Sequence, residues 1–480
     1  MTGAGTATEL DAADAPTRDA ARPPLTNRVP SMALIVIGGC AIVAAFSLLL
    51  PGTLSYDPTA WVVWGRQVGR LELDTVSGPS WKPLPVMVTT VFAPFGEAAP
   101  ELWMWAARTA GLVAVVGVVR LGAILAGPVA GLLAGALLIL TPDGEPRFVR
   151  TWAEGHDAPA TAALAVWAIE RHLAGRPRVA FGLVVALALL RPEAWPFALA
   201  YAAWLATATD VPTAVLALSL ATIPVLWFGG DLWGAGDPFQ GASAAQVIPL
   251  DLAERTTTAL GNVGTMVIVP AWCAAGVAVV LAVRRRDVVP LALAALAMMW
   301  CAVVSAMAII FGYAALSRFL LPAAALVCVL AGFGLVQAVR LVSQPRLRIA
   351  LVAGIVATSA PFIIVRASGL PAVWNEVQFH DDLGTDLVAT IALIDFDPET
   401  SSCTTVAVEP LSQLQPATAW ELDTAMRDVR FTPEPGAVLF LVSVDSDAEE
   451  QLIANPTIEF VAEVGTIAAY ARSCAPQGQP

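Results

Sequence analysis

Apolar runs that are long enough to cross a bilayer recur from residue 32 to residue 365. The first occupies 32–50, and others follow at 102–120, 126–140, 158–172, 179–190, 195–207, 212–228, 263–283, 288–311, 319–339 and 349–365. Of all residues, 57% are hydrophobic and only 14% are charged, whereas soluble domains carry about 25% charged residues. A soluble fold is therefore excluded. We predict a polytopic α-helical membrane protein with about eleven transmembrane helices.

The arginines of the short loops collect on one side of this series of helices. They are Arg171, Arg176 and Arg178, then Arg284, Arg285 and Arg286, and then Arg340, Arg346 and Arg348. The three loops share a side with residues 1–31, which lack apolar periodicity and which we expect to form a disordered cytoplasmic tail. Because basic loops stay in the cytoplasm, we predict a multi-pass protein of the inner (plasma) membrane, with the N terminus inside and the C terminus outside.

The formal charge of −13 comes from the C-terminal part of the chain. Residues 367–480 contain eighteen Asp or Glu against three Arg, a net charge of −15, which leaves +2 for the rest. This acidity argues against nucleic acid as a partner. Strand-like runs at 404–408, 438–444 and 458–464 alternate with helix-like runs at 419–428 and 447–454. We therefore expect a small extracytoplasmic α/β domain over 367–480, after a membrane domain over 32–366.

Two of the six cysteines, Cys403 and Cys474, lie in the acidic domain, and the other four lie in apolar runs. Buried in such runs, a free cysteine behaves as a small hydrophobe. Outside the cytoplasm a disulfide persists. We expect Cys403 and Cys474 to pair and to tie the beginning of the domain to its end; two free thiols are the alternative.

Ionisable residues gather on the predicted outer side, in or near the loops 51–101, 141–157 and 229–262. They are Asp57, Lys82, Glu154, His156, Asp157, Arg191, Glu193 and Arg318. Each has a structural alternative, since Asp57 before a proline suits a helix N-cap or turn and Arg191 suits a local salt bridge with Glu193. Ionisable groups at membrane depth are costly and indicate function. Together, beside an apolar slot, they suit a ligand with an anionic head and a lipid tail.

Three of these motifs resemble the polyprenyl-phosphate-dependent membrane glycosyltransferases of the GT-C fold, in particular the bacterial mannosyl- and arabinosyltransferase-like members. The matching residues are Asp57 in SYDPTAW, Glu154 and Asp157 in AEGHDAP, and Arg318 in SRFLLP. The stretches LAGPVAGLLAGALLILTP and LALLRPEAWPFAL are also similar to the helices of that family. The resemblance covers about residues 31–365 and implies a GT-C fold with an active site on the outer face.

The resemblance also implies a reaction. A sugar would pass from a polyprenyl-phosphate donor to a glycan, glycolipid or protein acceptor in cell-envelope or cell-wall biogenesis, with inversion of the anomeric centre. Asp57 would be the general base, and Arg318, with Lys82 or Arg191 as competitors, would neutralise the lipid phosphate. Glu193 and His156 would contact substrate.

A divalent cation, Mg²⁺ or Mn²⁺, is the possible cofactor, because carboxylates are hard ligands for such ions. Its expected ligands are Asp57, Glu154 and Asp157. Two further functions stay open from the sequence. A non-catalytic envelope-assembly scaffold of the same fold is one. A lipid or solute transporter is the other, although the sequence shows no internal repeat and its charges lie at one face, unlike many transporters.

Overall fold

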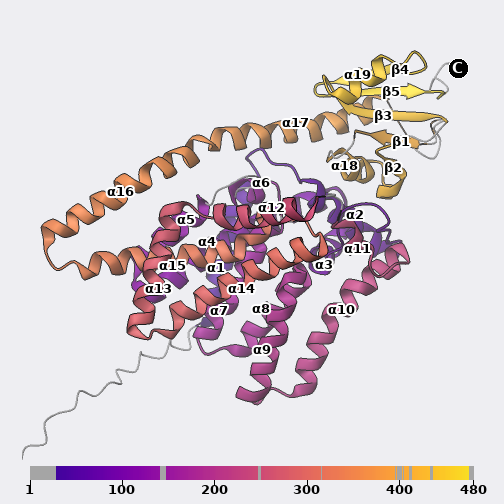
Figure 1. Cartoon of the computed structure of the whole chain (residues 1–480). Helices are drawn as coiled ribbons and strands as arrows, with labels where there is room; N and C mark the ends of the chain where they lie inside the picture. Colours follow the sequence, from indigo (N-terminus) through magenta and orange to yellow (C-terminus); the bar gives the residue numbers. More distant parts are fainter. Residues whose placement is uncertain are drawn as a thin grey trace, which may run out of the picture.

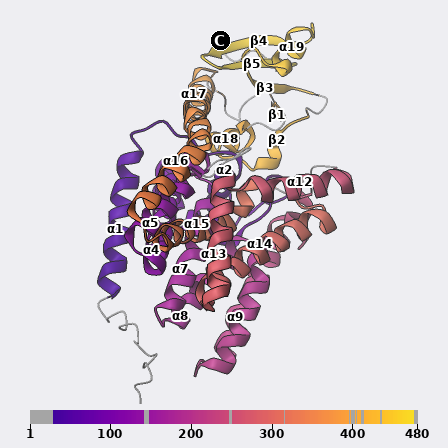
Figure 2. The ribbon, with the colours of Figure 1, turned by 60° about the vertical axis from the view of Figure 1, so that its left-hand side comes forward.

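The computed structural model describes residues 29–140, 148–246, 250–314, 316–394, 396, 403, 405–409, 413–432 and 436–474. The expected N-terminal tail lies outside these residues, apart from its last three, where the first helix has already begun. Helices form most of the described chain, and a small sheet lies at one end of the helical bundle (Figures 1 and 2).

The helices of the N-terminal half are α1 (Val29–Ser47), α2 (Tyr56–Arg70), α3 (Pro83–Phe92), η1 (Ala93–Ala98), α4 (Ala99–Ala126), α5 (Pro128–Ile139), α6 (Phe148–Ala153), α7 (Ala158–Leu173), α8 (Pro177–Leu190), η2 (Pro192–Ala194), α9 (Trp195–Ala208) and α10 (Thr213–Ala235). Those that follow are α11 (Gln240–Ala244), α12 (Leu252–Thr265), α13 (Val269–Arg285), α14 (Val288–Phe311), η3 (Ser317–Leu320), α15 (Leu321–Leu341), α16 (Pro345–Ser368) and α17 (Leu370–Ile394).

Every predicted span overlaps a helix, although 263–283 crosses the bend between α12 and α13, and many of these helices are short. In the described part of the chain, five helical segments are long and apolar enough to cross a membrane, and a sixth is possible if α12 and α13, bent by 76°, form one span. The α5 helix has 12 residues, which is about 18 Å against a hydrocarbon core of about 30 Å. The chain is a multi-pass membrane protein, and about eleven crossings stay a prediction.

The α15 helix is the centre of the bundle. Its side chains are buried continuously from Leu321 to Gly334, which is the pattern of a helix that is surrounded on all sides. Small residues allow its neighbours to approach closely: a Cβ on Gly332 would clash with the backbone of α5 at Ala130, and one on Gly334 with that of α13 at Ala274. This packing fixes η3, the turn immediately before α15, on which Arg318 lies.

The C-terminal domain contains a five-stranded sheet with the order β2-β1-β3-β5-β4. The strands are β1 (Thr405–Val408), β2 (Val429–Arg430), β3 (Val438–Ser443), β4 (Glu459–Val464) and β5 (Ile467–Arg472), with helices α18 (Leu414–Glu421) and α19 (Asp447–Ile453) and the turn η4 (Met426–Asp428). The strand β1 runs parallel to β2 and β3, while β5 is antiparallel to β3 and β4. The predicted α/β domain is confirmed, but α18 ends at Glu421, before the end of the predicted helix-like run 419–428, and residues 426–430 form η4 and β2 instead.

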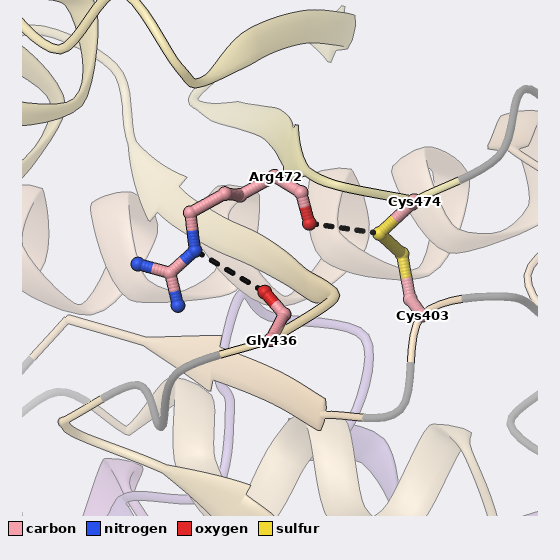
Figure 3. The surroundings of a disulfide bond; sticks show 4 residues. All are labelled: Cys403, Gly436, Arg472 and Cys474. Carbon is pink, nitrogen blue, oxygen red and sulfur yellow. Dashed lines mark hydrogen bonds between the residues drawn. A yellow bond between two sulfur atoms is a disulfide. The ribbon is translucent and has the colours of Figure 1, made fainter.

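Cys403 and Cys474 form a disulfide in the structure (Figure 3). It joins the segment before β1 to the residue that closely follows β5. Beside it, Arg472 Nε donates to the carbonyl of Gly436 at 3.3 Å. The bond thereby connects the two ends of the sheet domain.

The sheet domain is docked on α2 through a set of polar contacts. Arg70 donates to both carboxylate oxygens of Asp423, at 2.7 and 2.9 Å, and Arg66 Nε lies 3.1 Å from the same carboxylate. Arg66 also donates to the carbonyls of Ala419 and Trp420 at the end of α18. A bidentate arginine pair fixes orientation as well as distance, so the domain has a defined position over α2.

Candidate functional site

Asp57 lies in the first turn of α2, where a carboxylate interacts favourably with the helix dipole. Its Oδ2 accepts a hydrogen bond from Arg318 Nη2 at 3.1 Å and lies 3.8 Å from Lys82 Nζ. The side chain of Asp57 is 17% exposed and so remains partly accessible to solvent. Among the described residues no hydrogen bond reaches its Oδ1. Asp57 and Arg318, which are 261 positions apart in sequence, therefore meet directly.

Asp157 is the second carboxylate of the site and is fully buried. Lys82 Nζ donates to its Oδ2 at 2.9 Å, and Arg191 Nη2 donates to its Oδ1 at 2.8 Å. Lys82 precedes α3, Asp157 precedes α7 and Arg191 follows α8. The carboxylate thus joins the ends of three helices.

Aromatic rings support the cations. Lys82 Nζ lies 4.7 Å from the centre of the Trp61 ring, and the guanidinium carbons of Arg191 and Arg318 lie 4.3 and 5.7 Å from that of Phe319. Such contacts stabilise a desolvated cation by up to about 2 kcal/mol. We call the group Asp57, Lys82, Asp157, Arg191 and Arg318 the cation–carboxylate cluster.

Burial and charge act in opposite directions on the pKa values of this cluster. Burial raises the pKa of Asp57, but Arg318 and Lys82 together lower it by more than burial raises it. The pKa of Asp57 therefore lies below its ordinary value. For Asp157 the same balance, with Arg191 and Lys82 as the cations, gives a pKa well below the usual range. Burial and the nearby Arg191 lower the pKa of Lys82. Both aspartates are therefore ionised at neutral pH.

Glu193, in the turn η2, is buried, and neither of its carboxylate oxygens has a hydrogen-bond partner among the described side chains. Burial raises its pKa. Arg191, two positions earlier, likewise has Nε and Nη1 without partners there. Glu193 lies beside the cluster, and both it and Arg191 retain capacity for hydrogen bonds that a bound molecule could use.

Glu154 and His156 connect the site to α17. Arg150 Nε donates to Glu154 Oε1 at 3.0 Å, and His380 Nδ1 lies 3.5 Å from the same oxygen. His156 Nε2 lies 2.8 Å from Ser55 Oγ. Burial and the nearby Arg318 lower the pKa of His156 to about 4, so its ring is neutral at pH 7.

The expected metal ligands Asp57, Glu154 and Asp157 do not lie together as one group in the structure. In the described residues, no three His, Cys, Asp or Glu side chains are grouped so that they could hold an ion. The physical reason is that each carboxylate already has cationic partners: Arg318 for Asp57, Arg150 for Glu154, and both Lys82 and Arg191 for Asp157.

The structure thus brings Asp57, Lys82, Asp157, Arg191 and Arg318 together and places Glu193 and His156 beside them. Sequence reasoning missed three residues around the site. Ser55 contacts His156, while Glu376 and His380 of α17 reach Arg150 and Glu154. Glu376 and His380 are four positions apart and so share a helix face, which was the available signal.

No family model matches the sequence, and no curated protein matches it. Solved structures, in contrast, do match the fold of this chain. ArnT from Cupriavidus metallidurans in the apo state is 14% identical, with a TM-score of 0.53 over 92% of this chain and 98% of the other. The same protein bound to undecaprenyl phosphate gives 14% identity and a TM-score of 0.54 over 94% of this chain and 100% of the other.

An oligosaccharyltransferase from Archaeoglobus fulgidus, in complex with Zn and sulfate, is 13% identical, with a TM-score of 0.47 over 91% of this chain and 73% of that one. At these identities a structural match establishes the fold alone. The agreement with ArnT extends over nearly the full length of both chains. This chain therefore has the fold of ArnT, which is the GT-C fold that its motifs predicted.

Proposed function

We propose that this protein is a membrane glycosyltransferase, a hexosyl- or pentosyltransferase that moves a sugar from a polyprenyl-phosphate donor to a cell-envelope acceptor. The observation that carries the proposal is the cation–carboxylate cluster, in which three cations surround two carboxylates at one end of the bundle. The GT-C fold supports it, since one solved structure of this fold holds undecaprenyl phosphate.

The cluster has the charge that a lipid phosphate needs. Lys82, Arg191 and Arg318 supply three positive charges, while Asp57 and Asp157 supply two negative ones. Because burial favours the neutral form of Glu193, an excess of one positive charge remains, which matches a sugar phosphodiester. The unpartnered Nε and Nη1 of Arg191 provide donors for phosphate oxygens in a geometry that guanidinium groups favour.

Asp57 is the proposed general base. Its carboxylate is ionised and partly exposed, so it can accept the proton of an acceptor hydroxyl. The hydroxyl oxygen attacks the anomeric carbon as the bond from that carbon to the phosphate oxygen breaks, and the electron pair leaves with the lipid phosphate. Arg318 and Lys82 stabilise the charge that develops there. One displacement inverts the anomeric centre.

The proposed orientation places the cluster outside. On α7, Asp157 precedes the first turn and Arg171 lies in the last; on α15, Arg318 precedes the helix and Arg340 lies in its last turn. Cluster residues and loop arginines therefore lie at opposite ends of the same helices. By the positive-inside rule, the arginine ends are cytoplasmic, and the site with its sheet domain is extracytoplasmic.

The decisive experiment incubates the purified protein with labelled polyprenyl-phosphate sugars and envelope acceptors. Asp57→Asn should lower the transfer rate about 10²–10⁴-fold, while Asp210→Asn, at an exposed position between α9 and α10, should match the wild type. Full transfer by the Asp57 variant would refute the assignment of the base. Donor binding without turnover by the wild type would indicate a scaffold instead, and flux across vesicles a transporter.

A further inference from the structure

Two cavities meet at Arg108, on the side of α17 that faces the bundle. The first has a volume of about 430 Å³ and is lined by Leu50 and Pro51, which follow α1, and by residues of α4, α6 and α17. We call it the Arg108 cavity. The second, of about 500 Å³, lies under α17 and α18. Both volumes are within the range of about 300–1,000 Å³ that is typical of small-molecule sites. No residue of the cation–carboxylate cluster lines either cavity.

Arg108 is a buried cation whose charge is incompletely balanced. Its side chain lies on α4, and the residue is only 1% exposed. Nη1 donates to the carbonyl of Ser47 at 2.6 Å, and Nη2 donates to that of Ala153 at 3.0 Å. Within the described residues, its Nε has no hydrogen-bond partner and no carboxylate lies within salt-bridge distance; Asp381 interacts with its charge only from further away.

The two carbonyls come from the last residues of α1 and α6. A helix C-terminus carries at most about half a negative charge, and α6 has only six residues, so its dipole is small. Leaving a buried cation without a counter-ion in direct contact is costly. An anion in contact with Arg108 would remove that cost.

The two cavities differ in their capacity to accept an anion. Glu97, Glu101, Asp381 and Glu421 line the second cavity and would repel one. In the Arg108 cavity, the described lining contains no carboxylate: apart from Arg108 and the amide of Asn375, it is apolar or aromatic, with Leu50, Trp152, Val373 and Trp374. One cation in an apolar enclosure fits an anionic head group that is attached to a hydrocarbon chain.

We propose that the Arg108 cavity binds a single-chain anionic amphiphile, with its phosphate or carboxylate head on Arg108 and its chain against Trp152, Trp374 and Val373. The site is separate from the donor site. Its walls α6 and α17 carry Arg150 and Glu376, which form an ion pair at 2.7 Å. A bound amphiphile would therefore stabilise the junction between the membrane bundle and the sheet domain.

The test uses the purified full-length protein in detergent and measures binding by native mass spectrometry and titration. The probes are hexadecyl phosphate, palmitate and zwitterionic hexadecylphosphocholine. We expect one equivalent of hexadecyl phosphate, palmitate or both to bind with a Kd at least about tenfold below that of hexadecylphosphocholine, the effect of one charge-assisted hydrogen bond. Binding of the phosphate alone or of palmitate alone identifies the head group.

Two variants separate the charge from the cavity. Arg108→Gln should abolish the preference for an anionic head, and Arg120→Gln, which changes another arginine of α4 that pairs with Glu170, should retain it. Val149→Trp should fill the cavity and prevent binding while keeping Arg108. If Arg108→Gln fails to fold, Val149→Trp still tests whether the amphiphile binds in this cavity.

Equal affinity of the wild type for all three probes would overturn the proposal. So would absence of binding, a preference that survives in Arg108→Gln, or unchanged binding by folded Val149→Trp. Because the Arg108 cavity shares no residue with the cluster, these outcomes are independent of the transfer assay with Asp57→Asn.

Discussion

The arrangement of charged partners around the buried Asp157 carboxylate leads to a prediction about the stability of the protein. It is the only acidic partner within salt-bridge distance of Arg191 among the described residues, whereas Lys82 also has Asp57 at 3.8 Å. Replacing Asp157 by Asn removes the counter-charge of two buried cations at once. Replacing Lys82 by Met leaves the pair between Asp157 and Arg191 intact.

The magnitudes follow from this asymmetry. Breaking a buried ion pair so that one charge stays uncompensated costs about 3–5 kcal/mol, and we expect that loss for Asp157→Asn. Lys82→Met loses one charged hydrogen bond while Asp157 keeps Arg191, so we expect about 1–3 kcal/mol. In the double variant, the repulsion between Lys82 and Arg191 is absent as well. Its loss should therefore be smaller than the sum of the two single losses by about 0.5–3 kcal/mol.

Thermal unfolding of the four purified proteins in one detergent, followed by tryptophan fluorescence, measures this cycle. We expect Tm to fall in the order wild type, Lys82→Met, Asp157→Asn, and the double variant to be more stable than the sum of the two single losses predicts. The matched control is Asp210→Asn, an exposed position where we expect no change. Equal Tm for Asp157→Asn and wild type, or strictly additive losses in the double variant, would refute the reasoning.

Three further predictions concern single residues. Arg318→Met should lower the transfer rate about 10²–10³-fold in the donor-transfer assay, because it removes a donor to the departing phosphate; an unchanged rate would exclude that role. The wild type should lose about 2 kcal/mol of stability between pH 7.5 and 5, because burial lowers the pKa of His156 from about 6.5 unfolded to about 4, so its contribution is complete above pH 6.5 and declines as the pH falls towards 4. His156→Gln should flatten this dependence in pH-dependent unfolding, and an equally steep curve would contradict the cause. Cys403→Ser should destabilise the sheet domain by about 4 kcal/mol, because it opens a loop with a sequence separation of 71; Cys273→Ser, which changes an exposed free thiol, should not, and limited proteolysis with and without reductant distinguishes the two.

Much of the local structure follows from the sequence because it depends on local periodicity. The apolar runs placed a helix at each predicted position, and the strand-like runs at 404–408, 438–444 and 458–464 correspond to β1, β3 and β4. Helical and extended backbones repeat every 3.6 and 2 residues, so a window of a few turns contains the information. The strand β5 was missed, since IAAYAR has no clear alternation.

The sequence could predict which residues form the candidate site, but it could not predict which of them pair with one another. An ionisable residue near a membrane span indicates function by its cost alone, and this argument named Asp57, Lys82, Asp157, Arg191 and Arg318. It could not show that Lys82 pairs most closely with Asp157, or that Glu154 contacts Arg150 and His380. The expectation that Asp57, Glu154 and Asp157 bind a metal ion together could not take into account that each of them has a cationic partner.

The sequence by itself determined that this chain is a multi-pass membrane protein with an acidic α/β domain, because hydrophobicity and charge are properties of the residues wherever they lie. Only the tertiary structure decided which charges meet. Asp57 and Arg318 are 261 positions apart, and Arg66 and Arg70 reach Asp423 across more than 350 positions. Contacts over such separations depend on how α15 packs at the centre of the bundle and on how α17 returns the sheet domain to α2.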